Sequence, residues 1–331
     1  MPTPRILVTG GAGYIGSHVC KGLAERNFAP VTVDNMSRGN RWAVKWGPLE
    51  EADLSDGGAL RRIFELHMPA AVMHFAGFAY VGESVENPLL YYWNNVGGAA
   101  TLLRVMIDTG IVPIVFSSSC ATYGIPETIP IPEEHPQRPI NPYGFSKLFV
   151  ERMLADAGRA HGLRSVSLRY FNAAGADPDG EIGEAHDPEP HLIPRVLEAA
   201  RNGTAVTIYG DDYDTADGTC IRDYIHVSDI ADAHLRALDY LLTGGTSCAL
   251  NLANAQGYSV LDVIKTAQNV SGKRFRVEMA PRRPGDPPVL IGLSDRAREV
   301  LGWMPQRPHL DTQIRDAWNW LRRNPAITHR E

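Results

Sequence analysis

The sequence has few cysteines, no long apolar run and no excess of basic charge. Its four cysteines are far apart, so we expect free thiols in a reducing compartment and neither a disulfide framework nor a metal site. No stretch approaches the roughly eighteen apolar residues of a membrane span, and the apolar run before Thr9 is too short for a signal peptide. A cytoplasmic protein without a membrane partner is expected. The net charge of −6 is spread along the chain, which argues against a nucleic-acid partner.

The length and the order of the elements predict an α/β protein. At about 150 residues per domain, 331 residues suggest two domains. Strand and helix patterns alternate up to Phe171, which predicts a Rossmann-type doubly wound parallel sheet over residues 1–171. Glycine, proline and acidic residues then dominate, so residues 172–331 are predicted to form a smaller mixed α/β substrate domain. One segment, near 227–252, is predicted to return to the sheet.

The apolar patterns define the individual elements of the predicted fold. Strands are expected at 5–9, 29–34, 70–75, 111–117, 165–170 and 248–252. Helices are expected at 13–25, 56–67, 88–109, 143–161 and 227–242.

A glycine-rich loop follows the first predicted strand and opens the first predicted helix. Gly10 permits a tight turn, Gly13 allows a pyrophosphate to approach the backbone, and Gly16 allows the helix to pack against the strand. The helix N-terminus then offers N–H groups to phosphates. Asp34 ends the second predicted strand, where a carboxylate accepts ribose hydroxyls, so NAD is favoured over NADP. Arg38 argues in the opposite direction, for NADP, because an arginine at this position can hold a 2′-phosphate.

Tyr143 and Lys147 lie four residues apart, on one face of a predicted helix that begins after Pro142. The ammonium group can lower the pKa of the phenol, which would let Tyr143 take a proton from a substrate hydroxyl. The same pattern also suits the start of an ordinary amphipathic helix, so its meaning depends on the rest of the chain.

These motifs, with a serine run before Tyr143, resemble those of the UDP-sugar 4-epimerases, a group within the extended short-chain dehydrogenase/reductase family. The similarity runs over nearly the whole chain. Besides the glycine loop and the Tyr143/Lys147 pair, it rests on the blocks 34–37, 74–77, 81–84, 117–119, 169–172, 218–224 and 282–286.

The resemblance implies an isomerase that interconverts UDP-glucose and UDP-galactose through a 4-keto intermediate, with NAD as cofactor. It also implies a homodimer formed through the helices 88–109 and 143–161. The implied catalytic residues are Ser119, Tyr143 and Lys147.

The resemblance also implies two sets of binding residues. The cofactor would contact Gly10, Gly13, Tyr14, Ile15, Gly16, Asp34, Asn35, Asp53, Leu54, Phe75, Ala76, Gly77, Asn94, Ser119, Tyr143, Lys147 and Phe171. The UDP-sugar would contact Ser119, Tyr143, Asn172, His191, Leu192, Tyr209, Arg222, Arg283 and Asp286.

The chain departs from the family pattern at three positions. Ala79 stands where a lysine is common, His191 where an asparagine is common, and Leu290 where a bulky tyrosine often limits the pocket. The identity of the sugar is therefore open.

Three alternatives remain from the sequence. The local sequences at 119–124 and 139–144 also resemble those of the UDP-arabinose/UDP-xylose 4-epimerases. One alternative is therefore an enzyme that acts on UDP-pentoses, or on both UDP-hexoses and UDP-pentoses. A 4,6-dehydratase needs further acid and base groups, and Cys120 and Ala121 supply neither. A non-catalytic NAD-binding scaffold on the same fold would have no use for Ser119, Tyr143 and Lys147.

Overall fold

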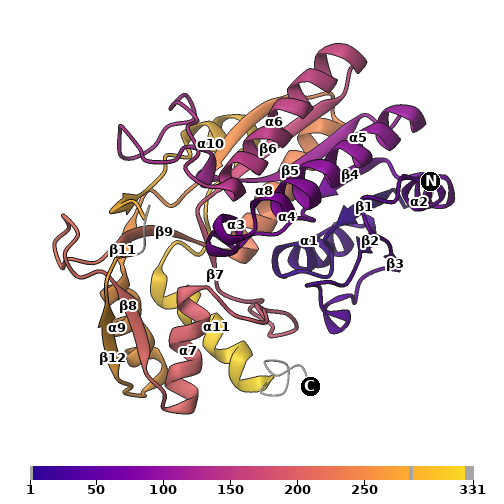
Figure 1. The fold of residues 1–331 in the computed structure, drawn as a ribbon. Helices are drawn as coiled ribbons and strands as arrows, with labels where there is room; N and C mark the ends of the chain where they lie inside the picture. The colour runs from indigo at the N-terminus through magenta and orange to yellow at the C-terminus, as the bar shows by residue number, and fades with distance from the viewer. Residues whose placement is uncertain (1–2, 283–285, 325–331) are drawn as a thin grey trace.

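The core of the computed structural model, which describes residues 3–282 and 286–324, is a parallel sheet of seven strands between two layers of helices (Figure 1). Every strand pair in this sheet is parallel. In spatial order the strands are β10 (Cys248–Leu252), β6 (Arg164–Tyr170), β5 (Pro113–Ser119), β4 (Ala71–His74), β1 (Arg5–Thr9), β2 (Ala29–Asp34) and β3 (Leu49–Glu51). The predicted fold class is thereby confirmed.

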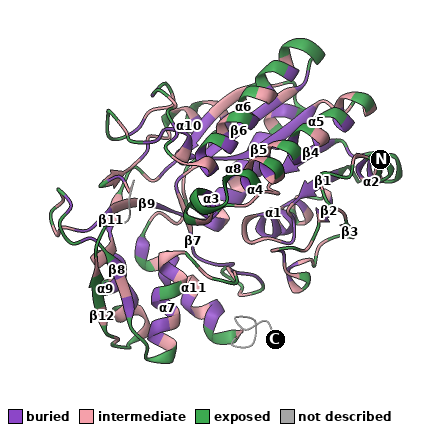
Figure 2. Ribbon diagram, viewed as in Figure 1, coloured by how far each residue is buried: buried purple, intermediate pink, exposed green. Residues whose placement is uncertain are grey.

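Alternation along the strands divides the apolar residues between the two faces. In β1, Ile6 and Val8 join one hydrophobic cluster and Leu7 joins the other, because successive side chains of a strand point to opposite faces. The first face is covered by α1 (Tyr14–Glu25) and α8 (Val227–Leu242). Both faces are covered, so the strands are buried almost throughout (Figure 2).

The second face is covered by α2, α5 and α6. The helices and short helical turns of this part not yet given are α2 (Gly57–His67), α3 (Val81–Glu86), α4 (Pro88–Tyr91), α5 (Gly98–Thr109), α6 (Pro142–His161), η1 (Arg41–Ala43) and η3 (Cys120–Thr122).

The long helix predicted over 88–109 contains a π-helical segment, η2 (Tyr92–Gly97), between α4 and α5. Segments of this kind insert an extra residue and are frequent at functional sites. In η2 the wider turn carries Asn94 and Asn95, and the side chain of Asn95 holds both backbone groups of Phe78. The apolar pattern of the sequence continues through this segment and did not reveal it.

Strand β5 ends two residues later than predicted. Its serines 117–119 continue the pairing with β6 as far as Ser119 opposite Tyr170. The polar end of the strand therefore still belongs to the sheet and reaches its carboxyl edge, where ligands bind in open parallel sheets.

A smaller lobe follows Phe171. Its third hydrophobic cluster lies among α7, α9 and α11 and two small sheets, in one of which β9 pairs with β7, β11 and β13 while in the other β8 pairs with β12. The strands are β7 (Asn172–Ala174), β8 (Val206–Tyr209), β9 (Ile221–His226), β11 (Gly257–Ser259), β12 (Val277–Ala280) and β13 (Val289–Leu290). The helices are α7 (Leu192–Asn202), α9 (Val260–Ser271) and α11 (Leu310–Arg323). Helix α10 (Asp295–Leu301) returns to the large sheet, where it packs against α8 and β10. None of the helices in the described ranges is long and apolar enough to cross a membrane.

Candidate active site

The glycine loop joins β1 to α1 at the carboxyl edge of the sheet. Gly10 has φ +71°, and a Cβ there would lie 2.6 Å from the backbone nitrogen of Ala76. A Cβ on Gly16 would overlap the carbonyl oxygen of Gly10. Among the residues that the structure describes, no side chain caps α1 at Gly13 and its first turn holds no acidic residue. The helix therefore presents backbone N–H groups and the positive end of its dipole, which suits a pyrophosphate.

The acidic residue after β2 is tied to this loop. Asp34 accepts hydrogen bonds from the backbone N–H of Ala12 at 3.2 Å and of Met36 at 3.0 Å. Burial raises the pKa of Asp34, and these two hydrogen bonds oppose the shift. Beyond it, Asn35 donates to Asp53 at 2.6 Å. Asp34, Asn35 and Asp53 therefore lie together beside the loop, as a site for a ribose and a base requires.

Arg38 is held by protein groups. Its guanidinium pairs with Glu83 at 2.6 Å and lies 4.6 Å above the ring of Phe78 and 4.5 Å above that of Tyr80. An arginine engaged in this way competes poorly for a 2′-phosphate, which favours NAD over NADP.

The other side of the cofactor bed comes from the segment after β4. The backbone N–H of Phe75 and of Ala76 both donate to the carbonyl of Thr9, at 2.9 and 3.1 Å, which places 75–77 against the glycine loop. Asn94 donates to Asn95 at 2.9 Å, and a Cβ on Gly77 would lie 3.3 Å from that same Asn95 oxygen. Predicted cofactor residues that are far apart in the sequence thus lie at one edge of the sheet.

Two further predicted cofactor residues are half-buried. Leu54 packs under α5, and Ile15 packs into the cluster beneath α1. Tyr14, which precedes Ile15, donates a hydrogen bond from its hydroxyl to the carbonyl of Gly175 at 2.7 Å. This side chain therefore connects the glycine loop to the smaller lobe.

Ser119, Tyr143 and Lys147 meet in one buried site. Ser119 ends β5, and Asn141 accepts from the N–H of Gly144 at 2.9 Å, which begins α6 beside it. The three residues are 6, 7 and 6 % exposed. The Lys147 Nζ donates to the carbonyl of Ser117 at 2.8 Å and lies 5.8 Å from the centre of the Tyr143 ring.

Burial dominates the electrostatics of this site. Burial, and next the neighbouring Tyr170, raise the pKa of the Tyr143 phenol, whereas a hydrogen bond with Ser119 lowers it. Burial lowers the pKa of Lys147 to about 8, against the opposing charge of Glu151. A phenol in this environment needs nearby positive charge before it can act as a base, and Lys147 is the cation within reach.

A buried ion pair supports the site from below. Arg169, on β6, pairs with Glu151, on α6, at 2.6 Å, and the two side chains are 7 and 8 % exposed. Glu151 also accepts from the hydroxyl of Ser118 at 2.5 Å. The pair therefore connects β5, β6 and α6 directly beneath Ser119 and Tyr143.

The predicted substrate residues come from several elements of the smaller lobe. Asn172 comes two residues after the end of β6, behind the predicted cofactor residue Phe171, so both lie next to Ser119 at the sheet edge. Arg222, on β9, is 3.7 Å from Asp286, measured from Nη2 to Oδ1. Tyr209 is exposed at the end of β8. The predicted contact Arg283 falls outside the described residues.

Residues before α7 form a cluster of two histidines and two glutamates. His191 lies 2.9 Å from Glu184 and 2.8 Å from Glu189. Burial alone would lower the pKa of His191, but the charge of Glu184 and hydrogen bonds to both carboxylates raise it to about 10. The predicted substrate residue His191 is thus already engaged with protein groups, and Leu192 beside it is half-buried at the start of α7.

Sequence reasoning missed five residues of these networks: Asn95, Glu151, Glu184, His186 and Glu189. The first two are separated by tens of residues from their partners, and nothing in their local pattern marks them. The last three had a signal, because glutamate and histidine recur within the eight residues 184–191.

Comparison with known proteins agrees with the family resemblance that the sequence motifs indicate. Residues 6–253 match the NAD dependent epimerase/dehydratase family. The UDP-glucose 4-epimerase of Rhizobium leguminosarum bv. trifolii is 52% identical over 97% of this chain and 98% of its own length. That of Rhizobium meliloti is 51% identical over 98% of this chain and 99% of its own.

Solved structures agree in fold as well as in sequence. A UDP-glucose 4-epimerase from Brucella ovis, in complex with NAD, superposes with a TM-score of 0.93 at 50% identity, covering 96% of this chain and 98% of that one. One from Bifidobacterium longum, in complex with NAD+ and UDP, gives 0.92 at 38% identity, covering 97% and 99%.

Proposed function

The chain belongs to the NAD dependent epimerase/dehydratase family and, within it, to the UDP-glucose 4-epimerases, and from this membership we propose that it interconverts UDP-glucose and UDP-galactose with NAD. The observation that carries the proposal is the meeting of Ser119, Tyr143 and Lys147 in one buried site at the carboxyl edge of the sheet. The glycine loop and Asp34 occupy the same edge, where a dinucleotide fits.

Tyr143 acts first as a base. Its phenolate takes the proton of the sugar 4-hydroxyl, while Ser119 orients that hydroxyl and Lys147 stabilises the phenolate by its charge. When bound, NAD supplies the acceptor for the hydride from C4 and returns it later. Tyr143 then gives its proton back to the 4-keto oxygen, so no net oxidation occurs.

The smaller lobe holds the UDP during both half-reactions. The 4-keto sugar must present its other face before the hydride returns. The protein therefore binds the UDP, away from the reacting carbon, and leaves the sugar free to turn. Arg222 and Asp286 suit a diphosphate and a ribose, since a guanidinium fork matches phosphate oxygens. We assign Asn172, Leu192 and Tyr209 to the same ligand.

The two predicted domains bind different ligands in this proposal. In this proposal residues 1–171, with the return segment 227–252, bind NAD, and residues 172–331 bind the UDP-sugar. The pairing of β10 with β6 supports the inclusion of the return segment.

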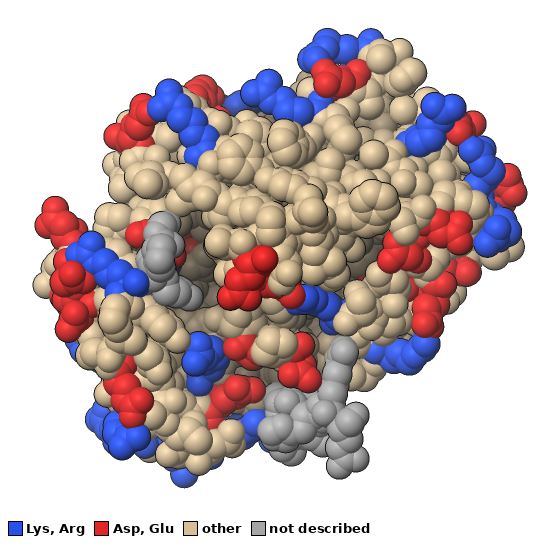
Figure 3. Space-filling view, viewed as in Figure 1, with Lys and Arg blue, Asp and Glu red and all other residues tan. Residues whose placement is uncertain are grey.

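A homodimer is part of the proposal. Large apolar side chains lie exposed on η2 and its neighbours α4 and α6, with Trp93 and Leu89 at 77 and 78 % exposure. Phe145 and Phe149, on α6, continue the same apolar surface. The surface over α4 and the middle of α6 carries few charged side chains in Figure 3. An apolar patch of this kind suits a partner surface, and the partner proposed is a second copy.

A cytoplasmic location completes the proposal. It is supported by the four cysteines, all free and three of them buried.

The test is direct observation of the reaction. The purified protein is incubated with UDP-galactose without added NAD, and the anomeric signals are followed by NMR. We expect equilibration with UDP-glucose, with no free keto sugar and no water loss. A parallel sample with UDP-N-acetylgalactosamine measures the tolerance that Leu290 leaves. Failure to convert UDP-galactose, with or without added NAD, would contradict the proposal.

A further inference from the structure

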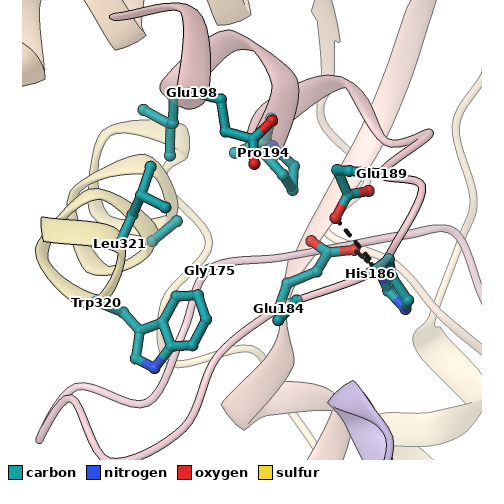
Figure 4. Close-up of a pocket in the computed structure, with 12 residues that line it drawn as sticks. Gly175, Glu184, His186, Glu189, Pro194, Glu198, Trp320 and Leu321 are labelled. Carbon is teal, nitrogen blue, oxygen red and sulfur yellow. Dashed lines mark ion pairs between the residues drawn. The ribbon is translucent and has the colours of Figure 1, made fainter. Parts of the chain in front are cut away.

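Two glutamates and two histidines converge where the segment before α7 meets the cofactor lobe. Figure 4 shows the carboxylates of Glu184 and Glu189 both pointing to His186. The fourth member is His191, and one ligand atom from each of the four lies within 4.8 Å of all the others. A small pocket, lined on its far side by Trp320 of α11, adjoins the group.

The separations between these atoms match those of a tetrahedral metal site. Bonds of about 2.0–2.1 Å from a metal to nitrogen and oxygen place tetrahedral ligands about 3.3 Å apart. The Nδ1 of His186 lies 3.2 Å from Glu184 and 3.4 Å from Glu189, and the Nδ1 of His191 lies 2.9 and 2.8 Å from the same two side chains. The two histidines approach different oxygens of Glu189. All four ligand atoms nevertheless lie within 4.8 Å of one another, so movements of the side chains alone would let them share one ion.

Burial and charge also fit an ion. The side chains of Glu184 and Glu189 are 9 and 8 % exposed. The Nδ1 of His186 is buried and faces both carboxylates at ion-pair distance. A bound metal ion displaces the proton from each imidazole. The two carboxylates with two neutral imidazoles then carry a charge of −2, which a dication neutralises without a further group.

We propose that Glu184, His186, Glu189 and His191 bind one transition-metal dication of the Zn²⁺ type. Imidazole nitrogen suits Zn²⁺ and its neighbours, whereas Mg²⁺ and Ca²⁺ take oxygen ligands. This proposal differs from the sequence prediction of no metal, which considered cysteine spacing.

A neighbouring acidic cluster shows the contrast. Asp177, Asp179 and Glu181 also approach one another, but the ammonium of Lys21 lies among them at 2.9, 2.8 and 2.8 Å. A lysine supplies the cation there. No lysine or arginine pairs with the Glu184 group in the described ranges, and its donors include two imidazoles.

The metal would connect the two lobes. His191 is the N-cap residue of α7, and its ring centre lies 6.0 Å from that of Tyr80, in the cofactor lobe. The ring of His186 lies 5.8 Å from that of Tyr80. An ion here fixes the entry to α7 against the loop after β4. The proposal does not depend on the sugar-nucleotide reaction.

The test is a titration of the full-length chain. The protein is treated with a chelator, exchanged into chelator-free buffer at pH 8, and titrated with ZnCl₂ against a chromogenic competitor. We expect one Zn²⁺ per chain. His186→Ala and Glu184→Gln should each weaken binding by about 10–100-fold or more. His161→Ala, at the exposed end of α6, is the matched control and should bind as the wild type does.

A second readout reports the geometry. CoCl₂ bound to the same protein should give the intense visible bands of a four-coordinate ion, and these should disappear in His186→Ala. If His186→Ala fails to fold, Glu189→Gln, which keeps the shape of the side chain, takes its place. Absence of stoichiometric Zn²⁺ binding, or equal affinity in the variant and the wild type, would overturn the proposal. So would a weak six-coordinate cobalt spectrum.

Discussion

The buried pair of Arg169 and Glu151 offers a quantitative test of what holds the catalytic site together. Glu151 is the carboxylate for the Arg169 guanidinium and also accepts from Ser118 and Gln137. Burial would lower the pKa of Arg169, yet the hydrogen bonds and charge of Glu151 raise it. In Glu151→Gln the shape is kept but the arginine charge is left buried without compensation.

The expected loss follows from the burial. Removing one partner of a buried ion pair lowers the free energy of unfolding by about 3–5 kcal/mol. An unfolding entropy of about 2.1 cal/mol/K per residue gives a 331-residue chain roughly 0.7 kcal/mol/K. Glu151→Gln should therefore lower the melting temperature by about 4–7 °C.

The matched control is the same substitution in an exposed pair. Glu127 pairs with Arg138, and these side chains are 59 and 72 % exposed. Glu127→Gln should change the free energy of unfolding by less than about 1 kcal/mol. The melting temperatures of both variants and the wild type are measured by calorimetry in one buffer. Equal shifts in the two variants would refute the assignment of stability to the buried pair.

Three further predictions concern catalysis, pH and assembly. Tyr143→Phe should lower kcat by about 10²–10⁴-fold while NAD stays bound, and unchanged turnover in an epimerase assay would contradict the mechanism. Burial lowers the pKa of His74 from 6.5 to about 3, so the folded chain binds fewer protons than the unfolded one between these values and stability falls as pH falls through that window. Melting temperatures from pH 7 to 5 should therefore drop less steeply in His74→Asn, and equal slopes would contradict this. Trp93→Glu should give single chains by light scattering where the wild type gives dimers, and a monomeric wild type would contradict the dimer.

Short-range patterns explain why much of the fold was predictable. The apolar run Ile6–Val8 and the glycines after it specify a strand, a turn and a helix within residues 5–25. Pro142 marks the start of α6. Helix α8 and strand β10 have the predicted bounds.

What the sequence did not reveal depends on distant partners. Nothing near Glu151 indicates that Arg169, on a strand eighteen residues away, needs its charge. Within the π-helical segment, Asn95 accepts a hydrogen bond from Phe78, seventeen residues earlier in the chain, and no local pattern indicates that contact. Asp34 was predicted from the glycine loop and the strand that it ends, whereas Asn94 and Arg222 were implied only by the family resemblance.

The pairing of β10 with β6 sets the order in which the chain can fold as it is made. The large sheet lacks its last strand, and one of its faces lacks α8, until synthesis has passed residue 252. At about 5–20 residues per second, roughly 4–16 s separate the emergence of residue 171 from that of residue 252. During this interval apolar side chains such as Met73 and Val115, on the strands that α8 later contacts, remain open to other nascent chains. Slowed translation between these residues would lengthen that exposure, so the yield of folded protein should be sensitive to it.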